Sequence, residues 1–232
     1  MHQAEYYQRL VRELGFPNGP LEPSVNVPDA ARAAGDRLLA DAGWDGKTPL
    51  VALAPGAAYG GAKRWPPESF AELAATLAAD GVTCVMIGST ADAETTTDVG
   101  RAAFARADFV RASARQRPDE NGGARAFKAS GAMFDLVGQT DLPTLAGVLT
   151  RCRALVTNDS GAMHLAAAAG VRVAAVFGPT NEHATRPLGD AHAVITHPVW
   201  CRPCMLRECP IDHRCMRGVR AAAVVDATRR ML

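Results

Sequence analysis

The residues best suited to chemistry lie in one segment, Leu155 to Thr180, which reads LVTNDSGAMHLAAAAGVRVAAVFGPT. An apolar run leads into Asp159, Ser160 and Gly161, and small apolar residues then continue to Gly170. This order predicts a buried strand, a turn that caps a buried helix, and a second apolar strand. The backbone N–H groups at such a helix N-terminus carry partial positive charge and favour an anion. We therefore predict an anion site at this turn, with the Ser160 hydroxyl donating to a phosphate oxygen.

Two further side chains are suited to the same anion. His164 follows Ser160 by one helical turn, and this spacing predicts that both lie on one face of the helix. Lys63 follows a loop of glycine and alanine residues and can reach a phosphate as a point charge. The plainer alternatives are a simple helix cap for the turn, a core position for the histidine and a solvated surface charge for the lysine. Spacing alone leaves these alternatives open.

Two familiar enzyme classes do not fit these residues. The stretch from Gly56 to Lys63 resembles a phosphate-binding P-loop, but the lysine comes one position late. Arg64 also stands where a P-loop has the Ser or Thr that binds magnesium. No G-x-S-x-G turn surrounds Ser160, as a serine hydrolase of the α/β class would require. The pattern argues against a P-loop kinase or ATPase and against a serine hydrolase.

Four of the six cysteines form a local cluster with the spacing C-x2-C-x4-C-x5-C, at Cys201, Cys204, Cys209 and Cys215. Four thiolates can close a tetrahedral zinc site, and in a reducing compartment such a cluster indicates metal more readily than disulfides. The spacing matches neither a standard zinc finger nor a ferredoxin. We predict a structural zinc site, with free thiols or disulfides as the alternatives.

Composition narrows the class of protein. The chain has 232 residues, 48% of them hydrophobic and 21% charged, with 25 basic and 24 acidic residues and a formal net charge of +1. This balance does not support a nucleic-acid partner. The sequence contains no uncharged apolar run of about 18 residues, so we expect no transmembrane helix. The polar N-terminus lacks the apolar core of a signal peptide, and the expected location is cytoplasmic.

The elements that must position these residues alternate between strand and helix. Apolar strands are predicted at residues 50–54, 82–87, 134–137, 154–157, 171–177 and 193–196. Helices are predicted at 6–14, 29–42, 68–79, 92–107, 141–152, 162–169 and 221–231. This alternation predicts an α/β fold, a Rossmann-like, doubly wound and mostly parallel sheet. Such sheets bind ligands at the carboxyl edge of their strands, where the turn at Asp159 would lie.

Three segments, in this order, resemble bacterial heptosyltransferases of glycosyltransferase family 9. The stretch APGAAYGGAKRWP, from Ala54 to Pro66, is similar to the segment that carries the family's phosphate-side lysine. NDSGAMHLAAAAG followed by FGPT is similar to its donor-site signature. CRPCMLRECPIDHRC resembles the cysteine-rich tail of the type II enzymes. The resemblance implies ADP-heptose as the donor and the C-terminal half of a two-domain GT-B enzyme as the fold.

The resemblance also implies roles for single residues around the donor. The donor-binding set is Lys63, Asp159, Ser160, Gly161, His164, Glu94, Thr140 and Thr180. Within it the glutamate would hold the ribose, Thr140 would lie by the base together with Leu142, and Thr180 would touch the sugar. The alternative for Glu94 is a simple surface charge, and the alternative for Thr140 and Leu142 is capping or core packing. Thr180 could serve the turn alone. Some relatives carry hydroxyl residues for the phosphates where Ala57 and Ala58 stand, so we expect those side-chain contacts to be lost here and the backbone N–H groups to serve instead.

The family pattern divides the chain into residues 1–48, an interdomain helix and linker, and residues 49–232, the donor-binding domain. The second part includes a mobile surface insertion at 108–132 and the cysteine-rich stretch at 201–215. We expect the N-terminal acceptor domain, with the aspartate that serves as the family's catalytic base, to be missing, so no catalytic residue is assigned. The whole enzyme would transfer heptose with inversion to the lipopolysaccharide inner core, with no cofactor needed for transfer, at the inner face of the cytoplasmic membrane.

Two other functions remain open from the sequence. A nucleotide-sugar binding module without activity, or a fragment that needs a separate acceptor domain, would bind ADP but transfer nothing. An epimerase of the GT-B type would need further acids and histidines in the cleft, for which only His183 and His192 are available. The donor signature together with the cysteine-rich tail argues against the epimerase.

Overall fold

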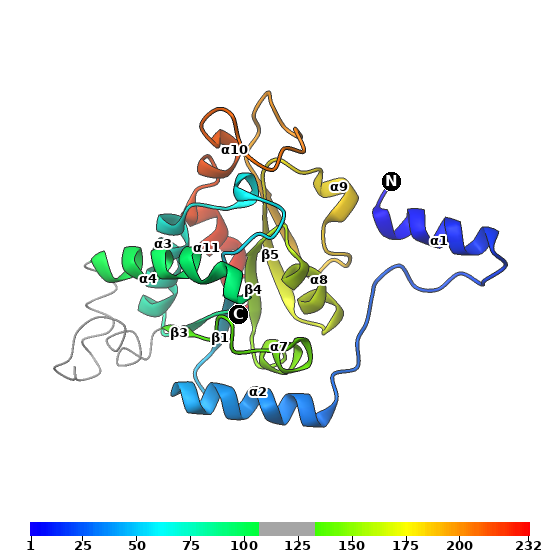
Figure 1. The fold of residues 1–232 in the computed structure, drawn as a ribbon. Coiled ribbons are helices and arrows are strands. Elements are labelled where there is room, and N and C mark those ends of the chain that lie inside the picture. Colours follow the sequence, from blue (N-terminus) through cyan, green and yellow to red (C-terminus); the bar gives the residue numbers. More distant parts are fainter. Residues whose placement is uncertain (107–132) are drawn as a thin grey trace.

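A computed structural model describes residues 1–106 and 133–232 of the chain, and the insertion predicted at 108–132 lies outside the described residues. In this part, six parallel strands form one sheet in the order β3-β2-β1-β4-β5-β6 (Figure 1). The strands are β1 Leu50–Ala54, β2 Thr83–Met86, β3 Met133–Asp135, β4 Ala154–Asn158, β5 Arg172–Phe177 and β6 Ala193–Thr196. The predicted doubly wound α/β sheet is confirmed. The strand order reverses between β1 and β4, which places a ligand crevice beyond their carboxyl ends.

Helices cover both faces of the sheet. One face carries α2 Asp29–Ala42, α7 Leu142–Leu149 and α8 Gly161–Ala168, and the other carries α3 Pro67–Ala79, α4 Ala93–Ala105 and α11 Ala221–Arg229. The side chains of β1 alternate between the two cores, with Val51 and Leu53 on the α3 side and Leu50 and Ala52 on the α7 side. A parallel sheet buried on both faces explains why its strands read as continuous apolar runs.

The contact between α2 and α7 is unusually close because each helix presents a glycine to the other. A Cβ atom on Gly35 would lie 2.5 Å from the backbone nitrogen of Val148, and one on Gly147 would lie 2.0 Å from the carbonyl oxygen of Ala31. This packing fixes α2 to the sheet domain, although α2 falls within the predicted linker region 1–48. The boundary at residue 48 stays a prediction.

Helix α1, Gln3–Glu13, lies apart from the sheet at the end of an extended, proline-containing stretch (Figure 1). Its apolar side chains, Tyr6, Leu10 and Val11 among them, are exposed, and none of its residues is buried. One contact with the sheet domain joins His2 Nε2 to the carbonyl oxygen of Arg186 at 3.0 Å. The helix predicted at 6–14 is confirmed and begins three residues earlier.

Several predicted boundaries shift for local reasons. Strand β3 ends at Asp135, two residues before the predicted end, because the Asp135 carboxylate accepts the backbone N–H of Val137 and turns the chain. Four short helical turns escaped prediction: η1 Gly61–Lys63, η2 Thr90–Asp92, α9 Glu182–Thr185 and α10 Arg214–Arg217. None of the helices in the described part of the chain is both long and apolar enough to cross a bilayer.

Candidate donor-binding site

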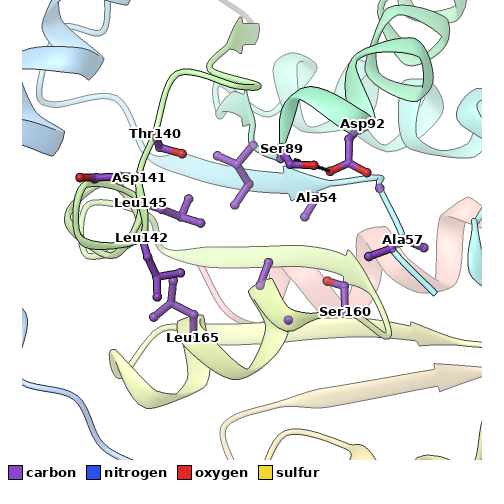
Figure 2. Close-up of a pocket in the computed structure, with 16 residues that line it drawn as sticks. Ala54, Ala57, Ser89, Asp92, Thr140, Asp141, Leu142, Leu145, Ser160 and Leu165 are labelled. Atoms are coloured by element: carbon purple, nitrogen blue, oxygen red, sulfur yellow. Dashed lines mark hydrogen bonds between the residues drawn. The ribbon is translucent and has the colours of Figure 1, made fainter.

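A cleft of about 360 Å³ lies at the carboxyl edge of the sheet, where the strand order reverses (Figure 2). Its walls come from the loops after β1 and β2, the start of α7 and the first turns of α8. Half of the sixteen residues that line it are apolar: Ala54, Ala57, Ala58, Ile87, Leu142, Leu145, Ala162 and Leu165. Thr140 lines this cleft together with Leu142, and their place beside the nucleotide base stays a prediction. Such a lining suits a flat, largely apolar group such as a nucleotide base.

One wall of the cleft carries a carboxylate that the sequence analysis missed. The Asp92 carboxylate accepts hydrogen bonds from the Ser89 N–H at 2.9 Å and from the Ser89 hydroxyl at 2.8 Å. The β1 loop passes so close that a Cβ atom on Gly56 would lie 2.0 Å from Asp92 Oδ1. Glu94, the residue predicted to hold the ribose, is exposed on α4 and does not line the cleft. The capping-box spacing from Ser89 to Asp92 is the signal that would have identified Asp92.

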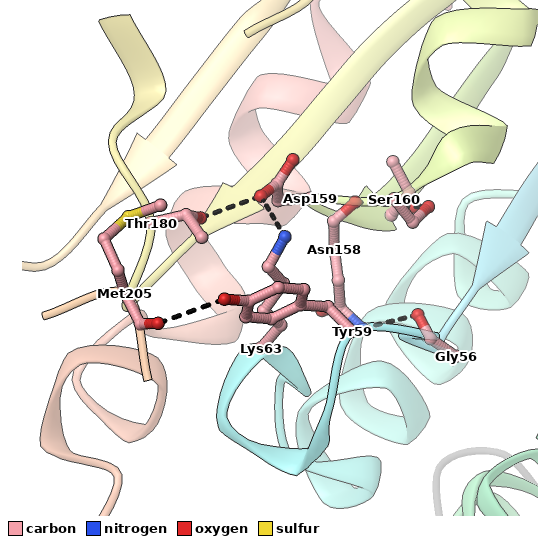
Figure 3. Close-up of polar contacts among 9 residues, drawn as sticks. Gly56, Tyr59, Lys63, Asn158, Asp159, Ser160, Thr180 and Met205 are labelled. Atoms are coloured by element: carbon pink, nitrogen blue, oxygen red, sulfur yellow. Dashed lines mark hydrogen bonds and ion pairs between the residues drawn. The ribbon is translucent and has the colours of Figure 1, made fainter. Parts of the chain in front are cut away.

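Three of the predicted residues meet beside this cleft (Figure 3). Lys63 Nζ lies 2.6 Å from Asp159 Oδ2, with only 12% and 8% of the two side chains exposed. The Thr180 hydroxyl donates to the same carboxylate oxygen at 2.8 Å. Asp159 is therefore engaged by an ammonium group and a hydroxyl group, and the helix-cap alternative for it does not hold.

The N-terminus of α8 has no side-chain cap. Ser160 is the N-cap residue and makes no capping hydrogen bond, and its hydroxyl lies 2.9 Å from that of Thr157. A Cβ atom on Gly161 would meet no other heavy atom within 4 Å, so this position faces open space. The positive end of the α8 dipole therefore points into a cleft with room for an anion.

A buried asparagine that was not predicted as a site residue holds the two sides of the crevice together. The Asn158 side chain donates to the carbonyl oxygens of Pro55 at 2.7 Å and Gly56 at 3.3 Å, and it accepts the Trp65 N–H at 3.0 Å. Asn158 has no exposed surface. These bonds fix the chain before and after Lys63 to the end of β4, next to Asp159.

His164 is not on the face that the sequence predicted. It lines a second cleft, of about 210 Å³, together with His2, Tyr7 and Arg186. The helical spacing fails because Ser160 is in an extended conformation, with φ −146° and ψ 167°, ahead of the first helical residue. Partial burial lowers the pKa of His164, while the charge of Asp159 opposes this shift and that of Lys63 adds to it. His164 is therefore within electrostatic range of the anion site, and its contact with the donor stays a prediction.

The cysteine cluster does not have the geometry of a metal site. Cys204 is exposed and Cys215 is buried, where burial raises the pKa of its thiol. The Cys209 sulfur accepts the backbone N–H of His213 at 3.3 Å. In the part of the chain that the structure describes, no three His, Cys, Asp or Glu side chains are grouped to hold a metal ion. The zinc ion stays a prediction from spacing that this geometry does not support.

The two histidines considered for an epimerase lie outside the main cleft. The His183 side chain is 80% exposed beside Glu182. His192 Nδ1 accepts the backbone N–H of Val173 at 3.2 Å, which gives it a structural role. Neither lines the cleft with Asp92 and Ser160.

An open parallel sheet with an uncapped helix N-terminus and a largely buried lysine at its crevice is the arrangement with which Rossmann-like folds bind anionic ligands. The family model described as glycosyltransferase family 9 (heptosyltransferase) matches residues 2–108 and 109–214. The chain belongs to this family.

Curated relatives agree with this assignment. Lipooligosaccharide heptosyltransferase 2 of Haemophilus influenzae is 33% identical over 150 residues, which are 65% of this chain and 37% of the relative. Lipopolysaccharide heptosyltransferase 2 of Salmonella typhimurium is 30% identical over 180 residues, 78% of this chain and 44% of the relative. The chain thus spans less than half the length of these two relatives.

A solved structure supports the fold assignment. The structure of Escherichia coli ADP-heptose lps heptosyltransferase II superposes with a TM-score of 0.70 at 24% identity. The match covers 94% of this chain and 56% of that one. At this identity the likeness shows the fold alone.

Proposed function

We propose that this chain binds ADP-heptose in the main cleft and supplies the donor-binding half of a heptosyltransferase. The whole enzyme transfers heptose to the lipopolysaccharide inner core with inversion at the anomeric carbon. The observation that carries this function is the Lys63–Asp159 pair beside the uncapped N-terminus of α8. Family membership and the names of the relatives, which specify heptosyltransferases, support it.

The cleft suggests a specific placement of the donor. The adenine ring rests among Leu142, Leu145 and Leu165, and the ribose hydroxyls donate to Asp92. The diphosphate then reaches the N-terminus of α8 at Ser160. Glu94 is exposed and does not line the cleft, so this placement gives the ribose role to Asp92 instead.

Lys63 connects this placement to the chemistry. An ammonium group has three donors, so Lys63 can keep its bond to Asp159 while it donates to a phosphate oxygen. As the bond from the anomeric carbon to ADP breaks, negative charge grows on the leaving diphosphate. Lys63 and the α8 dipole stabilise that charge and thereby lower the barrier.

Thr180 is placed to affect the sugar and the orientation of Asp159. Its hydroxyl holds the Asp159 carboxylate in position and lies next to the expected sugar end of the donor. A general base must also take the proton of the acceptor hydroxyl. We assign no such base in this chain and expect it in the part of the whole enzyme that binds lipopolysaccharide. That acceptor is an amphiphile, so we expect the enzyme to work at the cytoplasmic face of the membrane.

Calorimetric titration of the chain with ADP and with ADP-heptose tests the donor site. We expect saturable binding that Lys63→Ala weakens strongly, while Lys47→Ala, a change at an exposed lysine, leaves it unchanged. A folded chain that binds neither ligand would contradict the proposed function.

Release of ADP from ADP-heptose in the presence of heptose-deficient lipopolysaccharide then tests transfer. Release by the chain alone would show a complete active site. Binding without release would identify a donor-binding module, which is the second function left open by the sequence. Adding a separately produced acceptor domain of a relative would then decide whether the module can support transfer.

A further inference from the structure

We infer that the Cys-rich segment, residues 201–215, positions Lys63 for the donor diphosphate, with Glu208 and Tyr59 as positioning residues. The inference rests on the proposed function, because it concerns the placement of the lysine that would bind the donor. It gives the Cys-rich segment a role that requires no metal. The parts involved are this segment and the lysine loop, residues 57–63.

Three hydrogen bonds join the lysine loop to the Cys-rich segment. The Gly61 N–H donates to Glu208 Oε1 at 3.0 Å, and the Ala62 N–H donates to the carbonyl oxygen of Arg207 at 2.9 Å. The Tyr59 hydroxyl donates to the carbonyl oxygen of Met205 at 3.2 Å (Figure 3). All three bonds lie within four residues of Lys63, so the segment fixes the backbone that presents the ammonium group.

The two parts approach so closely that the lysine loop needs glycine. Gly60 has φ +151°, and a Cβ atom there would lie 2.4 Å from the Arg207 carbonyl oxygen. A Cβ atom on Gly61 would lie 2.8 Å from Glu208 Oε2. Glycine in a loop gives the backbone many alternative conformations. The hydrogen bonds from the Cys-rich segment select one of them.

Tyr59 connects the segment to the ammonium group itself. Lys63 Nζ lies 4.6 Å from the centroid of the Tyr59 ring, and the Arg207 guanidinium lies 5.0 Å from the same centroid. Both distances fall within the range of cation–π attraction. The ring is therefore held by Arg207 and Met205 of the segment while its face stabilises the ammonium group of Lys63.

The same segment also holds the loop after β5, which carries the other partner of Asp159. The Met205 N–H donates to the carbonyl oxygen of Pro179 at 2.8 Å, and Arg202 Nε donates to that of Gly178 at 3.0 Å. Arg202 is further fixed by Glu182 at 2.8 Å. Pro179 directly precedes Thr180. One segment thus secures the loops that bring both Lys63 and Thr180 to a single carboxylate.

Hydrogen–deuterium exchange on the whole chain without ligand tests whether the Cys-rich segment holds the lysine loop in place. We expect Glu208→Ala to speed the exchange of the Gly61 amide about tenfold, because the amide loses its acceptor. Glu208→Gln keeps an oxygen acceptor and should keep the protection. Asp212→Ala is the matched control, because Asp212 is an acidic residue of the same segment that bonds to Arg214 and to no residue of the lysine loop. Unchanged exchange in Glu208→Ala would overturn the inference.

Calorimetric titration with ADP and with adenosine tests whether this contact positions Lys63 for the diphosphate. Glu208→Ala should weaken ADP binding about fivefold and Tyr59→Leu about tenfold, while adenosine binding stays within about twofold. Glu208→Gln and Asp212→Ala should match the unmodified chain. ADP affinity that is unchanged in Glu208→Ala, or equal losses for ADP and adenosine, would overturn the positioning role.

The two tests separate this inference from the proposed function. If the unmodified chain binds ADP but Glu208→Ala binds it equally well, only the positioning role fails. If the unmodified chain binds no ADP, the proposed function fails and positioning for a donor fails with it. The exchange measurement still decides in that case whether the Cys-rich segment holds the lysine loop.

Discussion

The proposed placement of the donor divides the site into a base side, around Ala54, Leu145 and Ala162, and a phosphate side, around Lys63 and Asp159. The two sides are built from different kinds of contact. The base side consists of residues at strand ends and on the first turns of helices, such as Ala54, Leu145 and Ala162, which the sheet itself puts in place. The phosphate side depends on loops that are distant in sequence. Lys63 and Asp159 are 96 residues apart, and Gly61 and Glu208 are 147 apart.

This difference has an energetic consequence. The base side is held by the same apolar burial that forms the two cores of the sheet, and it should persist wherever the domain folds. The phosphate side contains a nearly buried ion pair, which is costly to desolvate and depends on correct geometry. We expect substitutions on the phosphate side to affect ADP selectively, and those on the base side to affect adenosine and ADP alike.

The largest effect is expected for Lys63→Met, which removes the ammonium group from the phosphate side and leaves the base side unchanged. Loss of the charged donor should weaken ADP binding about 100-fold and leave adenosine binding unchanged, since adenosine has no phosphate. Calorimetric titration with both ligands measures this contrast. Lys47→Met at an exposed site is the control. An equal loss for both ligands would contradict the division of the cleft into two independent sides.

The same variant tests the ion pair as a structural element. Without Lys63, the carboxylate of Asp159 is left buried beside Thr180 alone, so the free energy of unfolding should fall by about 3 kcal/mol. The double change Lys63→Met with Asp159→Asn removes the unpaired charge and should recover part of this loss. Urea unfolding followed by circular dichroism gives both values. A single variant as stable as the unmodified chain would show that the pair is not needed for stability.

The next largest effect is expected for Ala162→Leu on the base side. The larger side chain fills part of the cleft, so adenosine and ADP should both bind about 30-fold more weakly. Ala222→Leu, at an exposed position of α11 on the other face of the sheet, serves as the control. If only ADP binding were reduced, the base would not lie against Ala162.

The fold was predictable because it follows from periodic patterns. Apolar runs and turn residues predicted the six strands and the turn at Asp159, whereas Thr140 was named from the family resemblance and its place by the base stays a prediction. The prediction that Ser160 and His164 share one face of the helix was wrong. Helical spacing does not apply to Ser160, because this residue is extended and precedes the helix. The start of α4 was also not predictable from the family pattern: Asp92, in the turn before α4, lines the cleft, whereas Glu94 on α4 does not, and the ribose role of Glu94 stays a prediction.

The contacts of the phosphate side were not predictable in detail. The lysine and the aspartate were recognised by their motifs, but nothing local to Tyr59 or Glu208 indicates a partner so far along the chain. Spacing suggested a metal for the cysteines, whereas the structure joins their segment to the lysine loop by three hydrogen bonds, each with a backbone group on at least one side. A backbone partner leaves no trace in side-chain patterns.

A smaller effect is expected for Asp92→Ala, which tests whether the ribose lies against Asp92 on the base side. Adenosine binding should weaken about tenfold, whereas 2′,3′-dideoxyadenosine, which lacks both ribose hydroxyls, should bind the variant and the unmodified chain equally. The same comparison with Glu94→Ala decides between the two acids. Loss of the preference for adenosine in Glu94→Ala rather than in Asp92→Ala would restore the role that the family pattern gave to Glu94.

The smallest effect concerns the pH dependence that His164 contributes. Burial lowers the pKa of this imidazole below its ordinary 6.5, so the folded chain favours the neutral form. Protonation is then more favourable in the unfolded chain, and the stability contributed by neutral His164 is present above pH 6.5 and is lost as the pH falls through the lowered pKa. A diphosphate bound near His164 reverses this preference, because a negative charge favours the imidazolium form.

ADP should therefore bind about threefold more tightly at pH 6 than at pH 8 because of this residue alone. Calorimetry at both pH values compares the unmodified chain with His164→Asn, so that the titration of ADP itself contributes equally to both. The variant should lose the added affinity at pH 6 and match the unmodified chain at pH 8, where the histidine is neutral. Equal pH dependence in the two proteins would place His164 outside the reach of the diphosphate and assign it to the second cleft, beside His2 and Arg186.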